Sequence, residues 1–191
     1  MKKAHKADSL EYAVQNSFCA KFNSYQVDVN GQKRTYYYNF VPNGKFFNWE
    51  SDLICSNMND ELLEFEIKAT RRDFKKDFEE KAEKHQLLKN AYDVTSAGGS
   101  IAKSLSRQVP NYFYFLVCDG EIKNEDVPEY AGYIVFSKPQ TSDNFHEISI
   151  EIKKKAPILH GDKATIEDLA RLKNIIYMKY WRSRNVGFII R

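Results

Sequence analysis

Apolar positions at the start of the chain recur with helical spacing. From Leu10 to Phe22 an apolar residue returns at every fourth position, which predicts a helix with one apolar stripe that packs on a sheet. Asp8 or Ser9 is predicted to cap its first turn, because both side chains can accept a hydrogen bond from a free backbone N–H. The chain is therefore predicted to open with an amphipathic helix.

Two later segments combine helical spacing with a capping signal. Thr70, followed three residues later by Asp73, predicts the start of a helix whose apolar face continues to about Asn90. Thr165 and Asp168 predict a final helix in the same way.

Strands are predicted where aromatic or alternating residues lie between turn signals. Arg34–Val41 and Lys45–Glu50 are predicted to form a hairpin around Asn43-Gly44. Asp52–Ser56 and Leu62–Ala69 are predicted to pair across a second turn at residues 57–60. The remaining predicted strands are Tyr112–Val117, Gly132–Ser137 and Glu147–Ile152.

The order of helix, strands, helix, strands and helix predicts an α/β domain with a mixed central sheet flanked by helices. The 191 residues fit one domain over 1–191, in which the Ser- and Gly-rich segment Asp93–Pro110 is predicted to be a loop or lid. No apolar stretch predicts a signal peptide or a membrane span, so we expect a cytoplasmic protein, bacterial or in a phage-infected cell, with no membrane contact. The odd number of cysteines, each among apolar neighbours, argues against a zinc site or disulfide framework: Cys19, Cys55 and Cys118.

Charge is distributed unevenly along the chain. The formal net charge is only +3, yet the segment from Glu151 to Arg191 holds ten Lys or Arg against four Asp or Glu. Within it, Lys153–Lys155 and Tyr180–Arg184 mix bases with aromatic residues, as a groove for a nucleic-acid strand would. A solvated surface and a helix end stabilised by its dipole explain the same pattern.

The segment Leu63–Lys68 carries the candidate chemistry. Strand alternation sends its apolar residues to one face and Glu64, Glu66 and Lys68 to the other, where a half-exposed strand with a charged solvent face is the alternative interpretation. The predicted neighbouring strand adds Asp52 to this face. Clustered carboxylates repel one another unless a hard cation such as Mg²⁺ neutralises them, and a lysine two residues beyond Glu66 lies roughly 6.5–7 Å along the strand.

Asp52 followed by Glu66-Ile67-Lys68 resembles the PD-(D/E)xK nucleases. The continuation Ala69–Phe74 with Asp77-Phe78 is similar to phage-encoded members and to MmcB-like DNA-repair proteins. The resemblance covers Ser51–His85 and extends more weakly to residues 111–117 and 127–132. Ser51 stands where the motif that names the family has proline.

This resemblance implies a restriction-endonuclease-like core and hydrolysis of DNA phosphodiester bonds with Mg²⁺, for which Mn²⁺ substitutes. It implies Asp52, Glu66 and the carbonyl of Ile67 as metal ligands, and Lys68 as the residue that orients or activates water. Related nucleases often supply one more catalytic glutamate from the first helix, which makes Glu11 a further candidate. A surface carboxylate near a helix N-terminus is the alternative interpretation of Glu11.

Basic residues follow the candidate strand directly. We expect phosphate contacts from Arg71, Arg72, Lys75 and Lys76, unless these bases pair with the acids interspersed at helical spacing. His85 lies on the apolar stripe of the same helix, where a packed histidine is more common than a ligand or base.

Three hypotheses follow for function. The first is a magnesium-dependent deoxyribonuclease acting in phage or bacterial DNA replication, recombination or repair. The second is a DNA-binding module that keeps the nuclease fold without catalysis. The third, a protein-interaction domain, predicts neither metal uptake nor salt-dependent DNA binding. DNA is the expected partner, and a homo-oligomer is compatible with the sequence.

Overall fold

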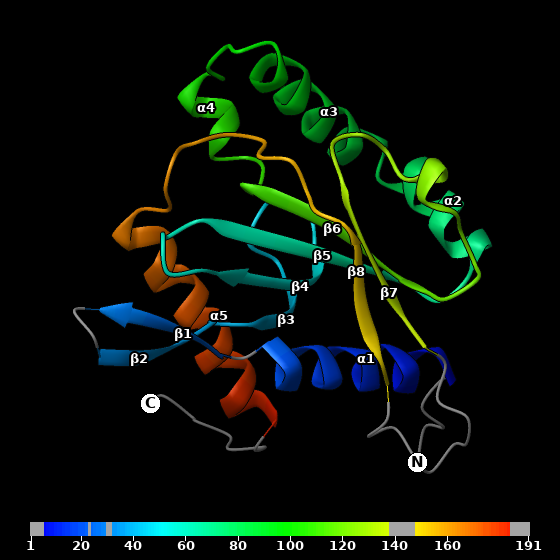
Figure 1. The fold of residues 1–191 in the computed structure, drawn as a ribbon, viewed down its shortest axis with the longest axis horizontal. Coiled ribbons are helices and arrows are strands. Elements are labelled where there is room, and N and C mark those ends of the chain that lie inside the picture. The colour runs from blue at the N-terminus through cyan, green and yellow to red at the C-terminus, as the bar shows by residue number, and fades with distance from the viewer. Residues whose placement is uncertain (1–5, 23, 30–31, 138–147, 184–191) are drawn as a thin grey trace, which may run out of the picture.

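The centre of the protein is a six-stranded mixed sheet in the order β3-β4-β5-β6-β7-β8 (Figure 1). The structure, a computed structural model, describes residues 6–22, 24–29, 32–137 and 148–183. β5, β6 and β7 are parallel, and the other neighbours in the sheet are antiparallel. The strands are β3 (Val41–Gly44), β4 (Ser51–Ser56), β5 (Leu62–Lys68), β6 (Tyr112–Cys118), β7 (Gly132–Phe136) and β8 (Ile150–Lys154).

Helices cover both faces of this sheet, as the sequence predicted. α2, α3 and α4 lie on one side, α1 lies on the other, and α5 packs beside β3 (Figure 1). β1 (Ser24–Val29) and β2 (Gln32–Tyr37) form a separate antiparallel pair. The helices are α1 (Lys6–Phe22), α2 (Arg71–Glu80), α3 (Ala82–Ser96), α4 (Lys103–Ser106) and α5 (Ile166–Ser183), with a 3₁₀ turn at Asn124–Asp126. No helix in the described ranges combines the length and the apolar run that a membrane crossing requires.

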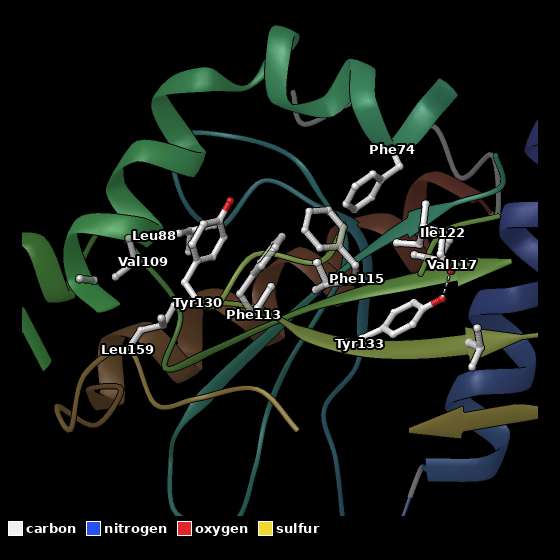
Figure 2. Close-up of a cluster of buried hydrophobic side chains, with 14 residues drawn as sticks. Phe74, Leu88, Val109, Phe113, Phe115, Val117, Ile122, Tyr130, Tyr133 and Leu159 are labelled. Carbon is white, nitrogen blue, oxygen red and sulfur yellow. Dashed lines mark hydrogen bonds between the residues drawn. The ribbon is translucent and has the colours of Figure 1, made fainter. Parts of the chain in front are cut away.

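The two faces of the sheet bury different side chains. The face beneath α2 and α3 mixes aliphatic residues with several aromatic rings, including those of Phe74, Phe113, Phe115 and Tyr130 (Figure 2). On the opposite face α1 packs aliphatic and aromatic residues against β4, β5 and β6, including Phe18, which lies 4.7 Å from Phe65 between ring centroids. Burial of these large side chains supplies the main driving force for folding.

Several predicted boundaries are confirmed. The hairpin of β4 and β5 turns at residues 57–60, where Asp60 has φ 59°. The N–H of Asp73 donates to Oγ1 of Thr70 at 3.1 Å, and the N–H of Asp168 donates to Oγ1 of Thr165 at 3.2 Å, so both predicted caps are formed. Cys55 and Cys118 are buried as expected; Cys19 is half-buried.

Other predicted boundaries are wrong. Residues 45–50 form no strand, because β4 pairs with β3 and places this segment in the connection between them. The segment predicted as one strand over 34–41 divides between β2 and β3. The helix predicted from residue 70 to about 90 breaks at Lys81, and its second half continues to Ser96, into the segment expected to be a loop. α4 occupies more of that segment. The strand predicted from Glu147 begins at Ile150; residues 138–147 lie outside the described ranges.

Candidate active site

β4 and β5 separate at the end that carries the acids. Backbone pairing between them runs from Ser56 to Leu53, whereas β4 stays paired with β3 up to Ser51. Beyond Leu53, a side chain replaces the backbone as the hydrogen-bond acceptor. Oδ2 of Asp52 accepts a hydrogen bond from the N–H of Ile67 at 2.7 Å. Because the N–H and C=O of a strand residue face the same neighbour, the Ile67 carbonyl faces the Asp52 edge of β5.

The charged face of β5 is buried beneath α2 and α3. Glu64 and Glu66 are 0% exposed and Lys68 is 6% exposed. The apolar residues of β5 share the other face, as predicted, and pack against α1. The alternative interpretation, a strand with a solvated charged face, is therefore wrong. Buried charges need partners, since an uncompensated ion in the interior is very costly.

Glu66 accepts hydrogen bonds from three lysines. Lys68 Nζ lies 3.1 Å from its Oε2, and Lys81 Nζ lies 2.8 and 2.9 Å from its two oxygens. Lys84 also donates to Glu66, and its Nζ lies 2.7 Å from Oε1 of Glu64. Two acids on β5 are thus neutralised by one lysine of the same strand and two from the helical layer.

Asp77 on α2 extends this network. Its Oδ1 accepts from Lys68 Nζ at 2.7 Å, and its Oδ2 lies 2.8 Å from Nε2 of His85. The other ring nitrogen of His85 lies 2.9 Å from the hydroxyl of Tyr130. The His85 ring also stacks on Phe78 at 4.3 Å between centroids, which confirms that it is a packed residue.

The network shifts the pKa values of its acids in opposite directions. Burial, reinforced by the negative charge of Glu66, raises the pKa of Asp52 to about 8. Burial would also raise the pKa of Glu66, but Lys84 and Lys68 outweigh it and lower the value to about 2. The two carboxylates are therefore close enough to interact, and Glu66 is the one that stays ionised.

Lys68, the lysine of the predicted site, stays charged. Burial by itself would lower the pKa of Lys68, but the negative charges of Glu66, Asp77 and Asp52 raise it above the ordinary lysine value. Its amine is therefore a hydrogen-bond donor at neutral pH.

Glu11 is joined to the site through another side chain. The amide of Gln15 on α1 donates to the backbone carbonyl of Asp52 at 2.8 Å and to Oε1 of Glu11 at 3.1 Å; it also donates to Asn43. Gln15 is buried and Glu11 is half-buried. The structure therefore brings Glu11 to the neighbourhood of Asp52.

The predicted phosphate-binding residues lie on the solvent side of α2. Arg71, Arg72, Lys75 and Lys76 are exposed and, with Glu79, line an open hollow of about 510 Å³. Two of them form exposed ion pairs: Arg71 lies 3.6 Å from Asp126, and Lys76 lies 2.8 Å from Glu80. Exposed pairs of this kind are weak, so they leave these bases accessible to a polyanion.

The C-terminal basic groups are only partly described. Lys153 Nζ lies 2.6 Å from Glu151, and Lys154 Nζ donates to the carbonyl of Pro128 at 3.0 Å. Arg184, the last residue of the second basic group, falls outside the described ranges. A groove for a nucleic-acid strand there stays a prediction.

Sequence reasoning did not find Lys81, Lys84 or Gln15. Lys81 and Lys84 follow Asp77 at i+4 and i+7, so all three lie on one face of a helix. Because this face borders the predicted apolar stripe, the spacing indicates that the three charged side chains point toward the sheet. Gln15 gives no such signal, because a glutamine on an amphipathic helix is ordinarily a surface residue.

The residues fit a hard cation in type and in number. Among the described residues no three His, Cys, Asp or Glu side chains form a group arranged to hold a metal ion. Mg²⁺, however, is usually held by one or two carboxylates together with water and substrate oxygens. Asp52 and Glu66, with the Ile67 carbonyl that faces the Asp52 edge of β5, are the oxygen ligands this part of the structure offers.

Comparison with known proteins assigns no family. No family model matches the chain, and no curated protein matches it. Among solved structures, the chain is similar to a protein of unknown function from Silicibacter pomeroyi, with 17% identity and a TM-score of 0.43 over 80% of this chain and 84% of that one.

Proposed function

We propose that this protein is a magnesium-dependent deoxyribonuclease with a restriction-endonuclease-like core, acting in DNA replication, recombination or repair. The observation that carries the proposal is the convergence of Asp52, Glu66 and Lys68 where β4 and β5 separate. Two interacting carboxylates and an ammonium group at one point suit a metal-assisted attack of water on a phosphodiester.

Asp52, Glu66 and the carbonyl of Ile67 are the residues that would hold the metal. When bound, Mg²⁺ supplies charge to stabilise a developing phosphorane and lowers the pKa of water. The hydrogen bond from the Ile67 N–H to Oδ2 of Asp52 fixes that carboxylate and leaves its Oδ1 for a ligand. This hydrogen bond therefore orients the first acid of the site.

Lys68 is proposed to act as a charged hydrogen-bond donor and not as a general base. Its raised pKa keeps it an ammonium group, which suits it to orient an attacking water or to stabilise negative charge on a phosphoryl oxygen. The carboxylate of Asp77, 2.7 Å away, holds the amine at the face of β5.

DNA binding is proposed to use the exposed bases of α2. α2 begins three residues after Lys68, so Arg71, Arg72, Lys75 and Lys76 are attached directly to the strand that carries the site. Phosphate contacts from such residues position a duplex without reading its sequence.

One observation favours the second candidate, a DNA-binding module without catalysis. The carboxylate of Glu66 is occupied by three ammonium groups, which compete with any cation for its oxygens. On this alternative, the ionic network supports the fold and the bases of α2 bind DNA.

The test is cleavage by wild type and Asp52→Asn. Wild type should cleave plasmid or oligonucleotide DNA with Mg²⁺ or Mn²⁺ and be inactive with EDTA. Asn keeps an oxygen for the Ile67 N–H but cannot supply a carboxylate. We expect it to lower the rate by more than the roughly 10–100-fold typical of residues outside the first coordination shell. Salt-dependent DNA binding should persist.

The matched control is Asp93→Asn, which makes the same chemical change at an exposed residue that pairs with Lys89. It should cleave as wild type does. DNA binding without cleavage of single-strand, duplex, flap or junction substrates would favour the non-catalytic module. Equal cleavage by wild type and Asp52→Asn would exclude Asp52 from the reaction.

A further inference from the structure

Lys81 stands between α2 and α3, where the sequence predicted one continuous helix. Its backbone is not helical, with φ −119° and ψ 37°, and its N–H donates to the carbonyl of Asp77 at 2.8 Å. Its side chain points toward β5, as does that of Asp77 four residues earlier. There Nζ lies 2.8 and 2.9 Å from the two oxygens of Glu66 and 3.2 Å from Oδ1 of Asp77.

Lys81 is the most exposed lysine on Glu66. Its side chain is 29% exposed, compared with 7% for Lys68 and 2% for Lys84. Lys84 is also held by Glu64 at 2.7 Å and by the ring of Phe113, 4.7 Å from its Nζ. Of the three lysines, Lys81 can therefore move from Glu66 into solvent with the smallest loss of buried contacts.

A cation that binds Glu66 competes with the ammonium groups already there. The cluster holds three carboxylates and three ammonium groups in ion pairs: Asp77 with Lys68, Glu66 with Lys81, and Glu64 with Lys84. A magnesium ion must approach a carboxylate oxygen to about 2.0–2.1 Å. An ammonium group within 3 Å of both Glu66 oxygens repels the ion and occupies the space on that side.

We infer that Lys81 is a built-in competing cation, which occupies the metal's place on Glu66 in the free protein and is displaced when a divalent cation binds. This inference rests on the proposed function, because it assigns the metal to Asp52 and Glu66. On this inference Lys81 sets the metal affinity. Glu66 is ion-paired with Lys81 in the free protein and becomes a metal ligand when Lys81 moves away.

The first test measures Mn²⁺ binding by calorimetry without DNA. Lys81→Met removes the charge and should tighten Mn²⁺ binding by about tenfold or more, since a unit charge near the ion is lost. Lys81→Arg keeps the charge and should bind as wild type does. Lys89→Met removes an equal charge from the exposed face of α3 and should leave the affinity unchanged.

The second test uses wild type and so does not depend on the folding of a variant. Amine acylation followed by peptide mass spectrometry should show that Mg²⁺ raises the labelling rate of Lys81, while buried Lys84 stays protected and exposed Lys89 is unaffected. Thermal unfolding adds a third measurement: Lys81→Met should be less stable than wild type without metal, and Mn²⁺ should raise its melting temperature more than that of wild type.

The outcomes separate this inference from the proposed function. If wild type binds Mn²⁺ through Asp52, but Lys81→Met binds no more tightly and Mg²⁺ leaves Lys81 labelling unchanged, the inference is wrong and the metal site stands. If Lys81→Arg binds Mn²⁺ as tightly as Lys81→Met does, the charge of Lys81 is not what lowers the metal affinity of wild type. If Asp52→Asn binds Mn²⁺ as wild type does, or if no variant binds it, the proposed metal site and the inference both fail.

Discussion

β5 carries a buried polar network at each end, and the two networks are built in different ways. At the start of β5, the side chain of Asn111 accepts from the N–H of Leu62 at 2.7 Å. It donates to the carbonyls of His160 at 3.0 Å and Asp162 at 2.8 Å. At the other end, Glu66 and its partners form a network of charged side chains. The first joins one neutral amide to backbone groups, whereas the second joins ions to ions.

This difference is the reason for proposing that the neutral network serves the fold and that the ionic network serves a function. Neutral hydrogen bonds to backbone groups satisfy buried polar atoms at little cost, and Asn111 thereby ties β5 to the segment that precedes α5. A buried ionic network is costly to desolvate, and apolar residues of similar volume often stabilise a fold as well. Clustered groups with strongly shifted pKa values are typical of functional sites.

The largest effect is expected from breaking the ionic network. Glu66→Gln leaves three ammonium groups without their shared carboxylate, so we expect the free energy of unfolding to fall by about 3–5 kcal/mol. Urea denaturation measures the change. Glu80→Gln removes an exposed carboxylate that pairs with Lys76 and should change stability by less than about 0.5 kcal/mol. A loss below about 1 kcal/mol for Glu66→Gln would mean that the lysines find other partners or lose their protons.

A smaller effect is expected from breaking the neutral network. Asn111→Ala leaves the Leu62 N–H and the carbonyls of His160 and Asp162 without this partner, which should lower the free energy of unfolding by about 2–3 kcal/mol. Mn²⁺ affinity should not change, because the proposed metal site lies at the opposite end of β5. Asn90→Ala, at an exposed position on α3, is the control. A change in Mn²⁺ affinity with Asn111→Ala would show that the two networks are coupled.

The sequence predicted the ionic network in part. Alternation in the β5 segment placed Glu64, Glu66 and Lys68 on one face, and that placement is confirmed. The burial of this face was not predictable from alternation, because it depends on which helix layer covers it. Lys81 and Lys84 come from that layer, and their distance from β5 depends on how the chain turns after residue 68.

The fold was predictable wherever local signals agreed. Three such predictions are confirmed: the helix caps at Thr70 and Thr165 and the turn at residues 57–60. At each place a residue that forms a local hydrogen bond coincides with a change in the spacing of apolar residues along the chain. The error at residues 45–50 has a different cause. Aromatic residues such as Phe46 and Phe47 are typical of strands, but here they are buried between the sheet and α5 without pairing.

The smallest expected effect is a pH response confined to the neutral network. Burial lowers the pKa of His160 below its ordinary value of 6.5, although Val109 and Asp162 act in the opposite direction. Its Nε2 is placed to donate to the carbonyl of Val109 at 3.1 Å, and its Nδ1 lies 3.3 Å from the Asn111 amide, which suits the neutral ring. The unfolded chain therefore binds a proton more readily than the folded chain just below pH 6.5.

His160 should consequently contribute full stability above pH 6.5 and lose it as the pH falls below that value, by at most about 1.4 kcal/mol per pH unit. Urea denaturation of wild type and His160→Gln between pH 5 and 7.5 measures the contribution, as the difference between the two slopes. The variant should be less stable than wild type at pH 7.5 and approach it as the pH falls. If the unfolding free energies of wild type and His160→Gln depend on pH with the same slope, the His160 ring binds protons equally in the folded and unfolded states. The stability of the neutral network would then not depend on pH.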